Sequence, residues 1–455
     1  MIGIAIFALF GSATQSSSFM PDPGMGYVVV TPFYNGDQSG TGTAAFPTTD
    51  SLVPVGPLTT ARADHTATLL RGGSVVIAGG VAGYGSSMSA IDSIETYDPQ
   101  TQSFASAGHL VTPRSDQTAT LLPDGTILYA GGKDALGYAL DAAETYDPRT
   151  GIARPTGAMA ERRFAASAIL LDDGKVLIVG GSNDSGPVNS VEIYDPSTGQ
   201  FGAAGWLDLR SGAVTATKLA GGGVLIAGGT GSAGGSGSAE VFDPATDTST
   251  PAVDMPVSRE SATSCLLADG TVMVVGGFGP DGRVNTTADI YSPTVAAFDG
   301  QFPLADRRAM NTTTALRDGS VLMVGGVDDS GNQIATVERF WPEKGVSEPI
   351  GTMATPRSGH TSTILSDGSV LIVGGRSNSA TVVAEAGIYF PDGQPAASAS
   401  PKANLTGSAP DIGSSPATGA ATPADGSAGS GNSLAPDGSA TGGASPGAAV
   451  SASPT

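Results

Sequence analysis

The sequence predicts an all-β propeller, a ring of seven blades with four antiparallel strands in each blade. Three observations predict this fold. A unit of 48 to 52 residues recurs seven times, and each copy contains a β-rich run that ends in Gly-Gly. The 455 residues include 66 Gly and 31 Pro and are only 14% charged, which suits short strands joined by tight turns. Rings of this size often form one domain.

The double glycines give the register of the repeat. They follow a run of β-branched and other apolar residues in every unit, so each marks the end of the same strand. The seven pairs are Gly79-Gly80, Gly131-Gly132, Gly180-Gly181, Gly228-Gly229, Gly276-Gly277, Gly325-Gly326 and Gly374-Gly375.

The second unit shows the order of strands, which we name a to d from the inside of the ring outward. DQTATLL is strand a, and the turn Pro123-Asp124-Gly125 leads into strand b, TILYAGG. A polar loop, strand c (AAETYDP), a short turn and strand d (IARPTGAMA) complete the unit. Asp-Gly favours a tight hairpin, because Gly tolerates the positive φ that such turns need.

This pattern resembles the kelch repeat, as found in bacterial kelch repeat-containing proteins. The shared features are the double glycine after strand b, an aromatic residue near the end of strand c, and an arginine before strand a, and they recur over residues 51–391. One departure is that kelch units usually carry Trp on strand d, whereas Phe104, Ile152 or Phe201 stands there in this chain. The resemblance implies a seven-bladed kelch propeller, with different packing at its outer edge.

The strand count predicts how the ring closes. The seventh unit ends in GIYFP at residues 387–391 and lacks its own strand d, whereas SLVPVGPL at residues 51–58 precedes the first strand a without a partner. We expect this N-terminal strand to complete the last blade, which removes the exposed edge of an open ring. Residues 27–34, YVVVTPFY, form a further edge-strand candidate.

The predicted propeller domain therefore spans residues 27–395 and is flanked by two different segments. Residues 1–26 begin with the apolar run IGIAIFALF, which resembles a signal peptide without a preceding Lys or Arg and is too short to span a bilayer. Residues 396–455 consist mainly of Ala, Ser, Gly, Pro and Thr and are expected to be a disordered tail. Export is expected, with a packed N-terminal strand and a cytoplasmic protein as the alternative.

Charge and cysteine content exclude several classes of function. A formal net charge of −21 disfavours nucleic acid and anionic membranes as partners, and no membrane span is predicted. The single cysteine, Cys265, excludes an internal disulfide and any multi-cysteine metal site. We predict no cofactor and no metal.

Variation between the units lies in the b–c loops, which share one face of the ring with the d–a loops. Binding sites concentrate on such loops. Tyr84, Tyr138 and Phe278 are their aromatic residues. A protein or carbohydrate partner is predicted here, with solvated connectors as the alternative, and the chain is expected to be a monomer.

An arginine precedes almost every strand a, and an acid recurs on strand c. A ring of guanidinium groups would bind a carboxylate or phosphate, but a pairing repeated in each blade is more typical of architecture. Arg357 differs, because Gly387 stands where its blade should carry the acid. The arginines are Arg62, Arg114, Arg163, Arg210 (one residue out of register), Arg259, Arg308 and Arg357, and the acids are Glu95, Glu144, Glu192, Glu240, Asp289 and Glu338.

Two histidines, His65 and His360, occupy the same position in blades that closure makes neighbours. Gln117 and Asn311 stand at this position in the blades on either side. We call these four residues the polar crescent. Together with Arg62 and Arg357, they are the predicted binding residues at the channel mouth. A metal would need further ligands, and Asp64 and Asp116 are the acids near in sequence.

The leading hypothesis is a non-catalytic interaction module, and the alternative is a sugar-active enzyme on a kelch propeller. The enzymes that the resemblance brings in are similar to galactose oxidase, which holds copper with two Tyr and two His, or to sialate mutarotases. His65, His360 and Arg357 would supply acid, base and anion-binding groups in the second case. Cys265 lies on an inner strand at a position held mostly by Thr elsewhere, which indicates packing.

Overall fold

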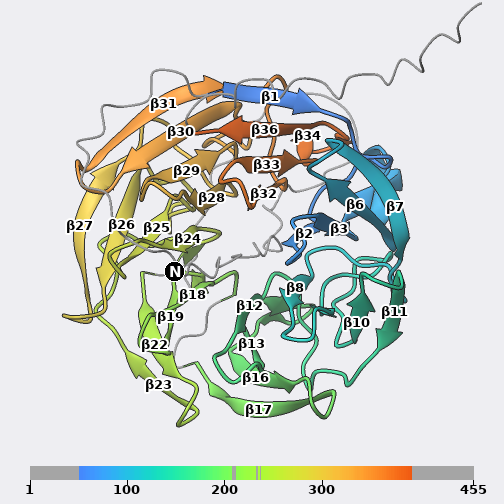
Figure 1. The fold of residues 1–455 in the computed structure, drawn as a ribbon. Helices are drawn as coiled ribbons and strands as arrows, with labels where there is room; N and C mark the ends of the chain where they lie inside the picture. Colours follow the sequence, from blue (N-terminus) through green and yellow to red (C-terminus); the bar gives the residue numbers. More distant parts are fainter. Residues whose placement is uncertain (1–50, 208–211, 232–233, 236, 392–455) are drawn as a thin grey trace, which may run out of the picture. The chain divides into compact units, whose positions relative to one another are not determined.

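The structure is a computed structural model that describes residues 51–391 except 208–211, 232, 233 and 236. Within this part the chain forms four-stranded antiparallel blades that follow one another around a ring (Figure 1), and a parallel pairing of His109 with Ile152 joins the outer strands of the first two blades. The predicted all-β propeller is confirmed. The signal-like segment 1–26, the edge strand at 27–34, the tail 396–455 and Arg210 lie outside the described residues.

The innermost strand of each blade, strand a, lines the centre of the ring. Each of these strands contacts the strand a of the blades before and after it, and the last contacts the first. They are β2 (Thr66–Leu69), β8 (Thr118–Leu121), β12 (Ser167–Leu170), β18 (Thr215–Lys218), β24 (Thr263–Leu266), β28 (Thr312–Ala315) and β32 (Thr361–Ile364).

Strand b lies next to strand a and is buried along its whole length in every blade, as expected for a run of Val, Ile, Leu and Met between two layers. These strands are β3 (Val75–Ala78), β9 (Ile127–Ala130), β13 (Val176–Val179), β19 (Val224–Ala227), β25 (Val272–Val275), β29 (Val321–Val324) and β33 (Val370–Val373).

Strands c and d complete each blade toward the outside. Strand c is β6 (Ser93–Asp98), β10 (Ala143–Asp147), β16 (Ser190–Asp195), β22 (Ala239–Asp243), β26 (Thr287–Ser292), β30 (Thr336–Trp341) and β36 (Ala386–Phe390). Strand d is β7 (Ser103–His109), β11 (Ile152–Pro155), β17 (Gln200–Trp206), β23 (Thr248–Pro251), β27 (Ala297–Pro303), β31 (Val346–Thr352) and β1 (Ser51–Val55).

The ring closes as the strand count predicts. β1 pairs antiparallel with β36, with Val53 opposite Ile388, so the last sheet has the order β1, β36, β33, β32. Figure 1 shows the two strands side by side, although they come from opposite ends of the described chain. The pairing satisfies the outer edge of β36, which would otherwise stay exposed.

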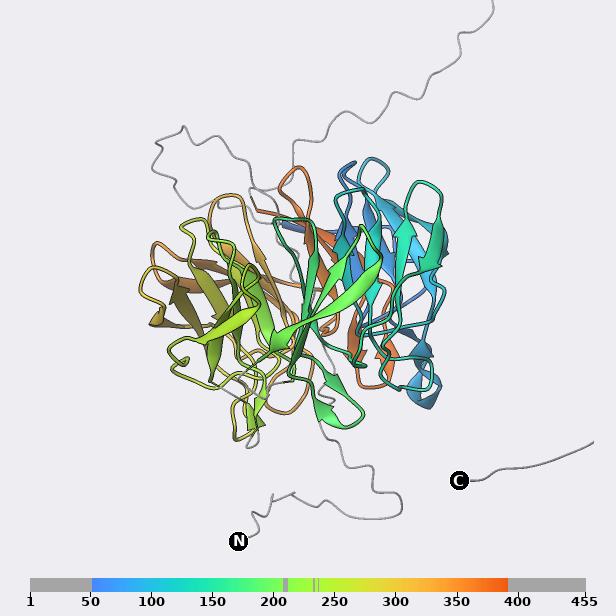
Figure 2. The same cartoon turned by 90° about the horizontal axis from the view of Figure 1, so that it is seen from below.

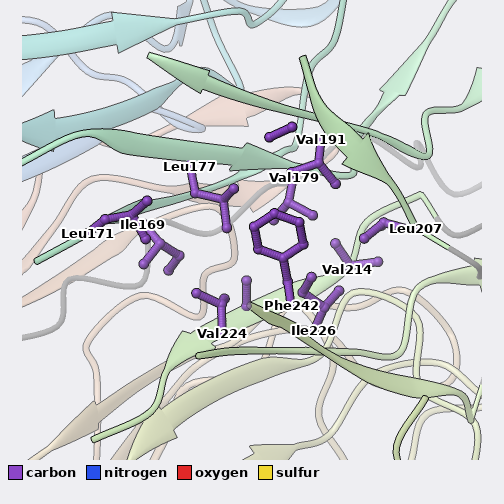
Figure 3. Close-up of a cluster of buried hydrophobic side chains, with 12 residues drawn as sticks. Ile169, Leu171, Leu177, Val179, Val191, Leu207, Val214, Val224, Ile226 and Phe242 are labelled. Atoms are coloured by element: carbon purple, nitrogen blue, oxygen red, sulfur yellow. The ribbon is translucent and has the colours of Figure 1, made fainter. Parts of the chain in front are cut away.

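The hydrophobic core lies between the blades. One cluster of buried side chains joins each pair of neighbouring sheets around the ring. In Figure 3, Phe242 of blade four points into the space between Val224 and Ile226 of its own blade and Leu177 and Val179 of blade three. No blade buries its apolar faces alone, so each depends on both neighbours.

The aromatic residue of strand c contributes to these clusters in every blade, and the missing Trp of strand d is replaced by smaller contacts. Tyr97 packs against Phe104 with ring centroids 5.0 Å apart, and Tyr194 packs against Phe201 at 4.9 Å. Ile152, at the same place in blade two, is half exposed. The outer packing therefore differs from blade to blade, as the sequence indicated.

Short hairpins extend the b–c loops of several blades. They are β4 (Val81–Ala82) with β5 (Ser89–Ala90), β14 (Ser182–Asn183) with β15 (Gly186–Pro187), β20 (Thr230–Gly231) with β21 (Gly234–Gly235), and β34 (Arg376–Asn378) with β35 (Thr381–Val382). The first contains a single 3₁₀ turn, η1 (Gly85–Ser87). Figure 2 shows loops projecting from both faces of the ring, with the sheets between them.

Candidate functional site

The b–c and d–a loops lie on one face of the ring, here called the loop face. In blade one, Ala63 of the d–a segment forms a β-bridge with Val81 at the start of the b–c loop. The same bridge joins the equivalent residues in other blades, for example Ser115 with Lys133. The predicted placement of these two sets of loops is confirmed.

Each described arginine that precedes a strand a by a few residues in the d–a loop, at the position of Arg114, forms an ion pair inside its own blade. In blade two, Arg114 Nη2 lies 2.7 Å from Glu144 Oε1, and both side chains are 1% exposed. The predicted structural pairing is confirmed for Arg62 with Glu95, Arg114 with Glu144, Arg163 with Glu192, Arg259 with Asp289, and Arg308 with Glu338.

The same arginine joins its blade to the preceding one, and we call this arrangement the arginine clasp. Arg114 Nη1 donates to the carbonyl of Gly131, the first glycine of its own blade, at 2.7 Å. The carbonyl of Arg114 accepts the N–H of Gly80, the second glycine of blade one, at 2.8 Å. Side chain and backbone of one residue therefore hold two blades together.

The clasp explains why two glycines are required. A Cβ on Gly79 would lie 2.5 Å from the carbonyl oxygen of Arg114, and a Cβ on Gly80 would lie 2.4 Å from the carbonyl oxygen of Ala63. Both glycines also have positive φ, of 64° and 91°. A side chain on Gly79 would push blades one and two apart, and a side chain on Gly80 would displace the d–a segment of its own blade.

Arg357 is paired as well, which corrects the expectation drawn from Gly387. Its guanidinium binds the carboxylate of Glu385, two residues before Gly387. This pair is more open than the others, because the Glu385 side chain is 50% exposed. The recurring acid on strand c correctly indicated the partners of the other arginines. It did not indicate Glu385, because this residue lies at the end of the b–c loop.

Burial lowers the pKa of Arg62, Arg114 and Arg308, and the paired carboxylate of each opposes this shift. Such a guanidinium stays charged because its blade supplies the counterion and the carbonyl acceptors. A ligand carboxylate or phosphate would have to displace these partners. The arginines therefore maintain the geometry of the loop face.

We predict that replacing Arg114 by Met lowers the free energy of unfolding by about 3–5 kcal/mol, because Glu144 stays buried without its counterion. The added change Glu144→Gln should recover part of the loss. The control is Arg149→Met, which removes an 82% exposed arginine from its pair with Asp147 and should leave the free energy of unfolding nearly unchanged. Urea unfolding measures all three, and equal effects of the two single changes would contradict the clasp.

Closure brings the two histidines of the polar crescent into neighbouring blades, as predicted, and each reaches back to the preceding blade. His65 Nε2 lies 3.1 Å from the hydroxyl of Thr361, and His360 Nε2 lies 3.1 Å from the hydroxyl of Thr312. The side chains are 5% and 2% exposed. They connect the inner strands of blades six, seven and one.

Gln117 and Asn311, the other two residues of the crescent, also form hydrogen bonds to the preceding blade. Gln117 donates to the carbonyl of Ala78 in blade one at 2.9 Å, and Asn311 donates to the hydroxyl of Thr263 in blade five at 3.3 Å. Both side chains are buried. The remaining blades carry apolar residues at this position, namely Ala166, Val214 and Ala262.

The two histidines are neutral in the folded protein. Burial and the nearby Arg62 hold the pKa of His65 well below its ordinary value. Burial, followed by the charge of Arg357, lowers the pKa of His360 to about 3. Neutral imidazoles are compatible with their role as hydrogen-bonding links between blades.

These shifts predict acid sensitivity. The unfolded chain takes up protons at these histidines below about pH 6.5, whereas the folded chain resists, so stability is full above that pH and falls as the pH drops toward 3. Each histidine should contribute a slope of up to about 1.4 kcal/mol per pH unit. Substituting His65→Gln and His360→Asn, the residues of the flanking blades, should remove this contribution.

Urea unfolding between pH 7 and pH 4.5 measures this difference in slope. His109→Gln is the matched control, because the His109 side chain is 66% exposed. Wild type and the control should lose stability in parallel, and the double variant should lose less. Equal slopes for all three proteins would show that the crescent histidines do not control acid stability.

Backbone hydrogen bonds join neighbouring blades at the channel mouth. The N–H of Asp64 donates to the carbonyl of Gly359 at 2.9 Å, Asp116 donates to Asp64 at 3.0 Å, and Ala165 donates to Asp116 at 3.0 Å. Asp64, Asp116 and Ala165 have φ near 55°, which is uncommon for residues with a side chain. Blades seven, one, two and three therefore meet in a fixed arrangement at the mouth.

The two acids at the mouth are paired with cations of the loop face. Arg376 Nε donates to Asp64 Oδ2 at 3.0 Å, and Lys133 Nζ lies 3.7 Å from Asp116 Oδ2. Among the described residues, no group of three or more His, Cys, Asp or Glu side chains is arranged to hold a metal ion. Arg376 was not identified from the sequence, because its partner is more than 300 positions away.

The aromatic residues of the loop face behave differently from one another. Tyr84 is 70% exposed and Tyr138 is 58% exposed, but Phe278 packs against Val284 and is half-buried. Leu136, which the sequence analysis did not consider, is 80% exposed. Leu136 stands in the segment Asp-Ala-Leu-Gly, and the turn residues Asp and Gly in this segment could have indicated its exposure.

Comparison with known proteins agrees with this repeat geometry. Residues 163–201, which run from the clasp arginine to strand d of blade three, match the kelch motif. A fungal alcohol oxidase of the AA5 family, solved in complex with copper, is similar over 76% of this chain and 77% of its own, with a TM-score of 0.58 and 18% identity. No curated protein sequence matches significantly.

The closed ring of four-stranded blades defines a β-propeller. Its arginine clasp, double glycines and strand c aromatics recur in every completely described blade, and one blade matches the kelch motif. The structure is therefore a β-propeller in which one blade carries a kelch motif. The likeness to the fungal oxidase concerns this fold.

The described residues do not fit a copper site of the oxidase kind. Cys265 lies in the hydrophobic cluster between blades five and six, and burial raises the pKa of its thiol to about 12. The Nε2 atoms of His65 and His360 are hydrogen-bonded to threonines of different blades.

No helix in the described part of the chain is long and apolar enough to cross a membrane.

Proposed function

We propose that this protein is a non-catalytic interaction module that binds a protein or a glycan through its loop face, as a monomer. The observation that carries the proposal is the exposure of Tyr84, Leu136 and Tyr138 on loops held by a rigid ring. Large exposed side chains on a preorganised scaffold are typical of binding surfaces. Kelch repeats commonly mediate protein binding, which supports the same function.

The predicted binding residues at the channel mouth favour this function less. Arg62 and Arg357 are engaged by carboxylates, and the crescent side chains are at most 5% exposed. These side chains offer little accessible surface to a protein partner. The variable loops above the mouth are directly accessible.

A sugar-active enzyme at the crescent is the second candidate, supported by one observation. Within the described part of the chain, His65 Nδ1, Gln117 Oε1 and Asn311 Oδ1 are buried without a hydrogen-bond partner. Buried polar atoms of this kind usually have water or a ligand beside them. A small polyhydroxylated molecule has the matching hydrogen-bonding groups.

One experiment separates the two candidates. The buried Cys265 leaves single engineered cysteines free for labelling, so Ser86→Cys and Ser330→Cys on the loop face and Gln100→Cys on the opposite face are each coupled to polyethylene glycol maleimide. Binders are selected on the unlabelled full chain from a random displayed peptide library and a glycan array. We expect at least one loop-face label to weaken binding about tenfold or more and the Gln100 label to leave it within about twofold.

The outcomes are distinct. Equal weakening by the label on the opposite face, or no selected binder, would overturn the proposed function. Binding or turnover of a sugar that survives loop-face labelling but is lost in the His65→Gln, His360→Asn variant would establish the second candidate.

We also propose that the protein is exported, on the basis of the apolar run at residues 2–10 and the small residues that follow it. Fractionating cells that produce the full chain or a chain without residues 1–13 tests this. The full chain should leave the cytoplasm and the shortened chain should stay there. A full chain confined to the cytoplasm would refute export.

A further inference from the structure

Building on the proposed function, we propose that the b–c loops of blades one to three form the main partner-binding surface. We call it the tyrosine patch and define it as Tyr84, Leu136 and Tyr138 with the acids Asp134 and Asp184. We infer that its partner is a protein segment in which Lys or Arg stands next to an aliphatic or proline anchor.

The apolar part of the patch distinguishes these blades from the opposite side of the ring. Tyr84, Leu136 and Tyr138 turn outward with 58% to 80% of their surface exposed. On the b–c loops of blades five and six, Phe278 and Val327 instead pack together in a small cluster. Tyr84 lies on the loop of blade one, which contacts blade seven, and Leu136 and Tyr138 lie on the loop of blade two, which contacts blade three. Exposed Tyr and Leu on the loops of adjacent blades provide anchors of the kind that dominate binding energy at protein interfaces.

Hydrogen bonds preorganise both loops. Around Tyr84, the N–H of Gly85 donates to the carbonyl of Ala380 in blade seven at 2.9 Å, and the Ser87 hydroxyl donates to the Tyr84 carbonyl at 2.7 Å. Tyr84 also forms a β-bridge with Thr381. The exposed ring is therefore carried by a backbone that two blades hold in place, which lowers the entropic cost of binding.

The loop of blade two is held by its acids. Asp134 Oδ1 accepts the N–H groups of Leu136 at 2.8 Å and Tyr138 at 2.9 Å, and Asp184 Oδ1 of blade three accepts the N–H of Ala139 at 3.3 Å. These contacts use one oxygen of each carboxylate as a neutral amide oxygen could. The negative charges themselves are not needed to build the loop.

The charge of the patch selects the partner. Neither Asp134 nor Asp184 forms an ion pair with a residue of the described chain, because the nearby cations are engaged elsewhere. Lys133 lies beside Asp116 and 4.1 Å from the centroid of the Phe164 ring, and Arg162 lies 3.7 Å from Asp141. Two carboxylates without an ion pair among the described residues, one on the loop of Leu136 and Tyr138 and one bonded to that loop, complement a cation flanked by apolar groups.

Peptides are selected on the full chain from a random displayed library, and calorimetry then measures the affinity of each peptide for the protein. They should be enriched in Lys or Arg next to aliphatic residues or proline. Replacing Tyr84 and Tyr138 together by Ser should weaken binding about tenfold or more. Asp134→Asn with Asp184→Asn keeps the loop acceptors and should weaken binding about threefold or more and flatten its salt dependence.

Two control variants leave the patch intact. Asp281→Ala with Arg283→Ala changes the loop of blade five, and Val295→Ser removes a 66% exposed apolar side chain outside the loop face. Both should bind as wild type does. Urea unfolding checks that every variant retains wild-type stability, as expected for exposed side chains.

Each of the other possible results refutes a particular part of the proposal. Binding that depends on Asp281 and Arg283 but not on the tyrosines would leave the proposed function standing and refute the tyrosine patch. Acidic selected peptides, or no effect of the two Asp→Asn changes, would refute the partner chemistry. A glycan whose binding depends on Tyr84 and Tyr138 would refute a protein partner, and binding insensitive to every loop-face change would refute the proposed function itself.

Discussion

The structure depends on the contact between the clasp arginine of one blade and the double glycine of the blade before it. The Arg114 side chain holds the b–c turn of its own blade through Gly131, while its carbonyl accepts the N–H of Gly80 across the interface. Neither glycine can carry a side chain without displacing a carbonyl of the loop face. Because one residue serves both contacts, the shape of a blade and its attachment to its neighbour are set together.

This contact explains why some parts of the blade maintain the fold while others can carry a binding surface. The hydrophobic clusters lie between blades, so a ring with a missing strand would expose apolar surface, and β1 removes that exposure by pairing with β36. The inner strands and the clasp arginines are engaged in these contacts between and within blades, so they are not available to a partner. The b–c loops contribute less to the core, so they are free to vary in sequence and to carry a binding surface.

The loop face is asymmetric although the fold is a repeat. Polar side chains link blades across the closure, where His65 and His360 bond to the inner strands of the preceding blades, whereas the far side uses Ala and Val at that position. The exposed side chains Tyr84, Leu136 and Tyr138 lie on blades one and two, while Phe278 on blade five is covered. Repetition builds the ring, and the departures from repetition give one sector its own chemistry.

The sequence by itself determined the architecture, because periodicity and the glycine pattern are local signals that seven copies reinforce. It identified the closing strand, the adjacency of His65 and His360, and the arginine partners on strand c. It did not determine that Arg357 pairs with Glu385, that Arg376 reaches Asp64, or that Phe278 turns inward while Leu136 turns outward. Those outcomes were decided by the tertiary structure, since loop side chains without a repeated partner take their positions from neighbours that only the closed ring brings near.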